Sequence, residues 1–162
     1  MSDGKYPEWM GKMRGLNADE IKEFLAGPVV ARIATIKSDG KPYITPVWQE
    51  WDGEALWFIP REKSAMVAHM KVNPDVALSC ALDGAPYTRL QIQGKAEIVA
   101  GPAIMEGEWL EMARRMSTRY LGERGPEYLE PSVPRPRYWV KVVPDKMTSW
   151  EGVEWAAKYL ES

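Results

Sequence analysis

Two Asp-Gly dipeptides, at positions 39–40 and 52–53, divide the first part of this chain into runs of β-forming residues. The runs are VVARIATI (29–36), KPYITPVWQEW (41–51) and EALWFIP (54–60). Asp-Gly between such runs is a strong hairpin signal, because glycine takes the positive φ angle that a tight turn of matching twist requires. The pattern therefore predicts three strands joined as an antiparallel meander. Pro42 and Pro46 fit this prediction only if the middle strand is bulged or lies at an edge of the sheet.

A basic, serine-containing turn follows the third run and leads into a predicted helix. The turn is Arg61-Glu62-Lys63-Ser64, and the helix AMVAHMKV (65–72) should end before Asn73-Pro74. The first amides of a helix have no intrahelical acceptor, and the helix dipole favours negative charge at that end. Two cations and a hydroxyl at this position therefore predict a site for an anion, with phosphate as the first candidate.

Composition excludes several classes of site and partner. The chain has 162 residues, enough for one domain with a core of its own, and its 21 basic and 23 acidic residues leave no excess of positive charge for binding nucleic acid. The apolar runs are shorter than the roughly 20 residues of a membrane-spanning helix, and the first ten residues lack the apolar core of a signal peptide. We expect a cytoplasmic protein with a small-molecule partner and no membrane partner.

Catalytic chemistry is limited by the presence of one cysteine, Cys80, and one histidine, His69. These two residues are too few for a disulfide or a structural zinc site, so we expect no metal site. A Ser-His-Asp, Cys-His or zinc-hydrolase mechanism is not expected either, because each needs a positioned base or several ligands and His69 is the only candidate base. His69 is expected to be a packed or surface residue rather than a catalytic base. The sequence contains neither GxGxxG nor a Walker loop, the fingerprints of Rossmann and P-loop nucleotide sites.

The segments around this region complete a mainly β pattern. Residues 1–16 are interpreted as an N-terminal arm and residues 17–162 as a single domain. The domain begins with a predicted helix that is capped by Asn17 and Glu20 and that ends at Gly27. Residues 76–82 and 87–99 are predicted strands, and the second alternates between apolar and polar side chains.

The C-terminal part is predicted to contain one amphipathic helix and one closing strand. Residues 105–121 carry Met, Trp and Ala at helical spacing, and this stripe is interpreted as core against the barrel. Residues 122–137 contain four prolines and are predicted to be irregular, although such a loop could close over a site; Arg124, Arg135 and Arg137 are expected to be solvated. Residues 138–143 form the predicted last strand, followed by a turn at 144–145 and a tail that ends in a short helix. The predicted fold is mainly β with peripheral helices, a closed or nearly closed antiparallel barrel of six to eight strands.

The chain contains eight tryptophans and seven tyrosines, most of which are expected to be core or interface anchors. Aromatic side chains beside an anion site suit a planar phosphorylated ligand. A chain poor in acid and base residues but equipped for such a ligand suggests a cofactor that carries the chemistry itself.

The order of several segments resembles the pyridoxamine 5′-phosphate oxidase-like, FMN-binding split barrels. The segments are VARIAT, SDGKPYITPVW, ALWFIP, the basic turn, NPDVALS, YTRLQIQGKAEIV and SWEG, and the resemblance covers the chain from about Asn17 onward. The resemblance implies a split β-barrel and a homodimer with two flavin sites in the grooves between subunits.

Site residues follow from this resemblance position by position. It implies that residues 45–48 lie along the isoalloxazine, that Ile59 and Pro60 flank the ring or ribityl chain, and that Arg89 reaches the polar rim of the flavin. The resemblance also implies that Trp150 lies at the cofactor groove, where the other subunit could supply it. The alternative is that Trp150 only anchors the interface between subunits. The full implied cofactor set is Thr45, Pro46, Val47, Trp48, Ile59, Pro60, Arg61, Lys63, Ser64, Ala65, Arg89 and Trp150.

Departures from the family pattern restrict the expected reaction. Met66 and His69 stand where members often have a basic residue and asparagine, and VEWAAKYLES (153–162) lacks the Arg and His pair that grips substrate phosphate in true pyridoxamine phosphate oxidases. We therefore expect an oxidoreductase that passes a hydride between bound FMN and another small organic substrate. The alternatives are an F420-dependent reductase of the same fold, a non-catalytic flavin- or haem-binding protein with His69 as the sole possible axial histidine, or a dimeric module with an empty groove.

Overall fold

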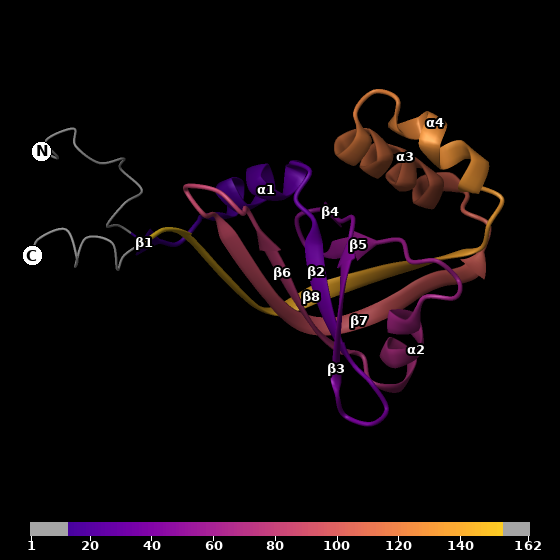
Figure 1. The fold of residues 1–162 in the computed structure, drawn as a ribbon, viewed down its shortest axis with the longest axis horizontal. Coiled ribbons are helices and arrows are strands. Elements are labelled where there is room, and N and C mark those ends of the chain that lie inside the picture. The colour runs from indigo at the N-terminus through magenta and orange to yellow at the C-terminus, as the bar shows by residue number, and fades with distance from the viewer. Residues whose placement is uncertain (1–12, 154–162) are drawn as a thin grey trace, which may run out of the picture.

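The computed structural model describes residues 13–153 and comprises a curved antiparallel sheet with helices at its periphery (Figure 1). Most of the predicted N-terminal arm and the predicted C-terminal helix lie outside the described residues. The strands are β1 (Met13–Arg14), β2 (Ala31–Ile36), β3 (Pro42–Val47), β4 (Glu50–Trp51), β5 (Leu56–Phe58), β6 (Asp75–Ala81), β7 (Arg89–Ala103) and β8 (Arg137–Gly152). The helices are α1 (Ala18–Ala26), α2 (Ala65–Val72), α3 (Gly107–Leu121), α4 (Gly125–Leu129) and the 3-10 turn η1 (Glu130–Ser132).

The sheet has eight strands in the order β3-β2-β6-β7-β8-β5-β4, with β1 paired to β8. The two end strands, β3 and β4, are consecutive in the chain and are separated only by Trp48 and Gln49. The strand path therefore returns to the place where it began, as in a split barrel. The predicted fold class is confirmed.

Both predicted hairpins are present, but the middle strand of the predicted meander is divided into β3 and β4. Gly40 and Gly53 have φ angles of 80° and 105°, as their turns require. β3 pairs with β2 and β5 pairs with β4 and β8, so β3 and β5 are not neighbours. The 41–51 run looked like one strand because its β-forming residues are continuous. In the structure the run is divided by Trp48 and Gln49, where the chain passes from one end of the sheet to the other. The edge position predicted for the proline-containing strand is confirmed.

The main core fills the barrel. The alternation predicted for residues 87–99 is confirmed, since Leu90 and Ile92 are 1% and 0% exposed while their neighbours face outward. Helix α1 covers one side of this core with Leu25, and its N-terminus has the predicted capping box between Asn17 and Glu20. The described residues contain no helix that is long and apolar enough to cross a membrane.

The segment before β8 corrects the prediction of irregular structure for residues 122–137. It contains α4 and η1, each with a proline in its first turn. Proline is tolerated there because its missing N–H would have no intrahelical partner. Figure 1 places α3 and α4 side by side at one end of the barrel, and the backbone of Gly125 approaches Ser117 of α3 too closely to leave room for a Cβ atom.

The last strand also differs from the prediction. β8 continues through residues 144–145, where we expected a turn. Opposite this point Gln93 pairs with Lys146 and Gly94 pairs with Pro144, so Asp145 is an extra residue in the ladder. The proline-containing dipeptide therefore marks a bulge rather than the end of the strand.

Candidate functional site

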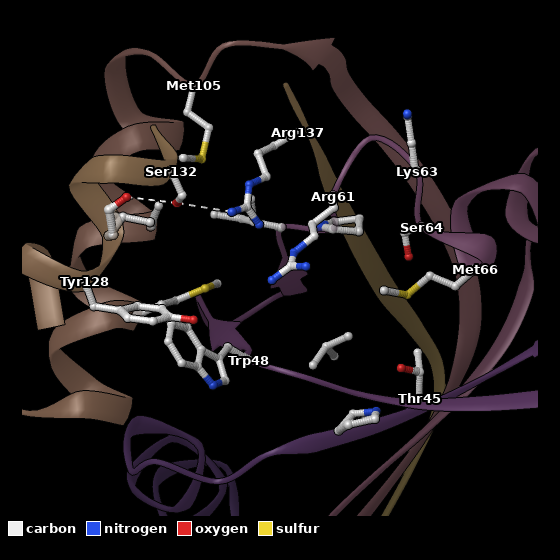
Figure 2. Close-up of a pocket in the computed structure, with 17 residues that line it drawn as sticks. Thr45, Trp48, Arg61, Lys63, Ser64, Met66, Met105, Tyr128, Ser132 and Arg137 are labelled. Carbon is white, nitrogen blue, oxygen red and sulfur yellow. Dashed lines mark hydrogen bonds between the residues drawn. The ribbon is translucent and has the colours of Figure 1, made fainter. Parts of the chain in front are cut away.

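A cavity of about 660 Å³ lies between the barrel wall and the helices α3 and α4 (Figure 2). Nine of the twelve residues implied by the family resemblance line it. They are Thr45, Pro46, Val47, Trp48, Ile59, Pro60, Arg61, Lys63 and Ser64. The other lining residues are Met66, Met105, Ala113, Met116, Tyr128, Leu129, Ser132 and Arg137. The structure thus brings together two segments that the hairpins separate, the end of β3 and the turn after β5.

One end of the cavity is formed by the turn from β5 into α2. The start of β8 fixes this turn, because the Tyr138 amide donates to the Pro60 carbonyl at 2.9 Å and Arg61 forms an isolated bridge with Arg137. Ser64 occupies the N-cap position of α2, but its hydroxyl makes no capping bond. The hydroxyl and the first amides of α2 are therefore at hand for an anion.

Three cations line the cavity without a carboxylate partner. Within residues 13–153, none of Arg61, Lys63 and Arg137 makes an ion pair. By contrast, Arg115 and Arg119 of α3 both pair with Glu50 of β4. Burial lowers the pKa of Arg137, and the positive charges of Arg61 and Arg135 lower it further. This arrangement leaves a positive potential that a bound anion would compensate.

The opposite wall is aromatic and apolar. The indole of Trp48 is stacked on Tyr120, and its ring centroid lies 6.5 Å from that of Tyr128 with 52° between the planes. Met105 and Met116 contribute side chains to the same space. The interpretation of the 105–121 stripe as core is therefore incomplete: both methionines are 2% exposed and also face the cavity.

Three of the implied cofactor residues do not line this cavity. Ala65 is the first residue of α2 and is exposed. Arg89 and Trp150 are paired across β7 and β8, with the Arg89 guanidinium carbon 5.3 Å from the Trp150 ring centroid. Arg89 Nη2 also donates to the Gly152 carbonyl at 2.9 Å. A role for these residues at a flavin remains a prediction.

The residues that sequence reasoning missed come from α3, α4, η1 and the start of β8. Arg137 was expected to be solvated, but it is partly buried and lines the cavity with Tyr128 and Ser132. The available signal was the proline-rich segment itself, which we expected to be able to close over a site.

His69 lies where a packed residue was expected. Its Nδ1 is 2.9 Å from the hydroxyl of Thr35, which is fully buried, and its ring meets Tyr43 edge-on. His69 is not among the cavity-lining residues. Among residues 13–153, no group of three or more His, Cys, Asp or Glu side chains is placed to hold a metal ion.

Comparison with known proteins agrees with this fold. A family model described as pyridoxamine 5′-phosphate oxidase matches residues 18–151. A search of curated proteins finds no match. Among solved structures, an F420 reductase has 29% sequence identity and a TM-score of 0.63, with 78% of this chain and 94% of that chain covered.

Two further structures are similar. A conserved hypothetical protein from Mycobacterium tuberculosis has 25% identity and a TM-score of 0.64, with 84% of this chain and 85% of that chain covered. The haem storage protein HutZ from Vibrio cholerae has 19% identity and a TM-score of 0.63, with 84% and 96% covered, and so shares the fold. From the match over residues 18–151, together with the split barrel, we conclude that the chain belongs to the pyridoxamine 5′-phosphate oxidase family.

Proposed function

We propose that the chain is an oxidoreductase that holds FMN in the 660 Å³ cavity and passes a hydride between the flavin and a small organic substrate. The observation that carries this proposal is the anion site at one end of the cavity. Arg61 and Lys63 have no carboxylate partner within the described chain, and Ser64 leaves the α2 N-terminus uncapped by its hydroxyl. These donors suit a phosphate, the group that FMN carries.

The remaining lining residues suit the other parts of the cofactor. The segment Thr45–Trp48 comprises the end of the edge strand β3 and the residue after it. An edge strand has peptide groups that are not used in the sheet. Ile59 and Pro60 provide an apolar flank between this strand and the anion site. Bound FMN would supply the hydride chemistry, while these residues orient the ring and exclude water from it.

The described lining of this cavity contains no imidazole, thiol or carboxylate, and Lys63 and Tyr128 are its side chains that could exchange a proton. Proton transfer by a positioned side chain is not part of the proposal, and the role of the chain is binding, orientation and electrostatic tuning. We also propose that the active form is a homodimer in the cytoplasm.

F420 is the second candidate cofactor. It carries a phosphoryl group on the side chain of a deazaflavin ring, so the same anion site would serve it, and a structure with 29% identity is that of an F420 reductase. Haem is a weaker candidate, because the only histidine, His69, is not among the cavity-lining residues and its Nδ1 lies beside Thr35.

Titration of the protein with FMN, riboflavin and F420 tests the proposal. Lys63→Ala and Ser64→Ala should weaken FMN binding by about tenfold to a hundredfold, the value of a charge-assisted hydrogen bond. Riboflavin, which lacks the phosphate, should bind parent and variants equally, and Lys22→Ala on the exposed face of α1 should change nothing. Equal weakening of riboflavin would contradict the anion assignment.

Reduction of the loaded protein separates an enzyme from a carrier. An oxidoreductase should lose its flavin absorbance with a reductant and regain it with an added organic acceptor. Bound flavin that is not reoxidised by any acceptor would favour a carrier. A protein that binds neither FMN nor F420 would favour an empty module.

A further inference from the structure

We infer that the half of the cavity beneath α3, α4 and η1 is a substrate subsite for an aromatic carboxylic acid, and that Arg137 receives its carboxylate. That this ligand is a substrate rests on the proposed function. The binding site itself depends on the residues of the chain alone.

Arg137 is held in place but retains unused donors. Its Nη2 lies 3.2 Å from the hydroxyl oxygen of Ser132, and that hydroxyl donates its own proton to the Leu129 carbonyl at 2.8 Å. The guanidinium is thus tied to η1 by one bond. Its Nε is buried and has no hydrogen-bond partner in the described chain. Nε is closed to solvent, but Nη1 makes no hydrogen bond within the described chain and is not enclosed, so it is the donor that a ligand oxygen would meet beside Nη2.

Arg137 lies apart from Lys63 and Ser64 of the predicted phosphate site, although its neighbour Arg61 belongs to that site (Figure 2). Figure 2 shows Lys63, Ser64 and Thr45 on one side of the cavity, and Tyr128 and Ser132 on the other. Arg137 enters from the side of Ser132, and Arg61 lies between the two groups. Donors at both ends, Lys63 and Ser64 at one and Arg137 at the other, with Arg61 between them, suit two anionic groups.

Charge in this half of the cavity is uncompensated. Besides the phenol of Tyr128, the titratable groups that act on Arg137 are Arg61 and Arg135, and both are cations. No carboxylate of the described chain pairs with Arg137. The planar fork of a guanidinium matches a carboxylate through two parallel hydrogen bonds, so a carboxylate is the group that best satisfies both its charge and its geometry.

The walls around Arg137 specify the body of the ligand. Trp48 and Tyr128 present two tilted rings, and Met105 and Met116 add polarizable thioethers. Such walls favour a flat apolar ring over an aliphatic or polar body. Tyr128 is 67% exposed, which places the aromatic wall at the mouth of the cavity, where a substrate would enter.

Calorimetric titration with 2-naphthoate and its neutral counterpart 2-naphthamide tests the inference. In the FMN-loaded protein, 2-naphthoate should bind about tenfold to a hundredfold more tightly than the amide, because it alone forms charge-assisted bonds. Arg137→Gln should remove this preference and leave amide binding unchanged. Arg137→Lys, which keeps the charge but loses the fork, should retain part of it.

Arg135→Gln is the matched control. It removes the same charge from the same segment, but Arg135 is exposed and does not line the cavity. The control should keep the preference for naphthoate. Loss of the preference in Arg135→Gln and Arg137→Gln alike would mean that the general positive potential binds the acid, and would overturn the assignment to Arg137.

Two other results are decisive. If Arg137→Gln weakens FMN by the same factor as Lys63→Ala and does not affect naphthoate, Arg137 belongs to the cofactor phosphate and the inference is wrong. If the protein fails to bind any flavin but the unloaded form still prefers naphthoate through Arg137, the proposed function fails while the acid-binding site stands.

Discussion

The indole ring of Trp48 lies parallel to the phenol ring of Tyr120, with the ring centroids 5.1 Å apart and 1° between the planes. This contact joins the cavity wall to helix α3. The Tyr120 hydroxyl donates to the Val29 carbonyl at 2.8 Å and accepts from the Gln49 amide at 3.1 Å. Tyr120 therefore positions the two residues that link β3 to β4, the strands at the two ends of the sheet path.

Tyr120→Phe should lower the free energy of unfolding by about 1–3 kcal/mol, because it leaves the Val29 carbonyl and the Gln49 amide without this partner. Urea denaturation measures the change. Tyr128→Phe is the control, since that side chain is 67% exposed and its hydroxyl makes no hydrogen bond to the described chain; it should change the stability by less than about 0.5 kcal/mol. Equal losses in the two variants would show that the Tyr120 bonds do not stabilise the link.

A homodimer should form through the uncovered edge of the sheet. The edge strand β3 exposes Tyr43 by 37% and Ile44 by 70%, and an unpaired apolar edge needs cover. We expect the dimer to bury on the order of 2,000 Å² or more in total. Sedimentation at micromolar concentration should give a dimer.

Substitution tests which surface forms that interface. Ile44→Lys places a charge on the edge strand and should shift the protein toward monomer. Leu121→Lys, which introduces the same charge at the end of α3 on a side chain exposed by 46%, should remain dimeric. A parent protein that is monomeric would count against a site shared between subunits.

His69→Gln should change the rate of flavin reduction by less than about tenfold. His69 packs on Thr35 and Tyr43 and does not line the cavity, whereas a positioned general acid contributes about 10²–10⁴-fold. Stopped-flow measurement of the reductive half-reaction gives the rate. A loss greater than about a hundredfold with cofactor still bound would overturn the proposal that the chain needs no histidine for proton transfer.

Trp150 should act across the dimer. It does not line the cavity of its own chain, so a contact with flavin requires the neighbouring subunit. Trp150→Ala should then alter the flavin spectrum and raise flavin fluorescence, because an indole near the ring quenches it. Mixed dimers of a Trp150→Ala subunit and a subunit carrying Lys63→Ala and Ser64→Ala should keep one intact groove and concentrate both defects in the other. Unchanged fluorescence in the single variant would identify Trp150 as an interface anchor.

Local features were predictable because they depend on neighbouring residues. The positive φ angles of Gly40 and Gly53, the edge position imposed by Pro42 and Pro46, and the capping box of Asn17 follow from the chemistry of a few positions each. The proposed anion site before α2 rests on the same kind of local signal, since its cations, hydroxyl and helix start are consecutive. The order of the segments along the chain was sufficient to predict the family to which the chain belongs.

Tertiary structure alone decided which distant segments meet. Sequence reasoning could not divide the 41–51 run at Trp48 and Gln49, because the pairing of β3 with β2 and of β4 with β5 depends on contacts across the sheet. It also could not bring Arg137 beside Arg61. That approach depends on the packing of α3, α4 and η1 against the barrel. Strand pairing and helix packing depend on burial shared between remote residues, whereas turns and caps are satisfied within one or two turns of the chain.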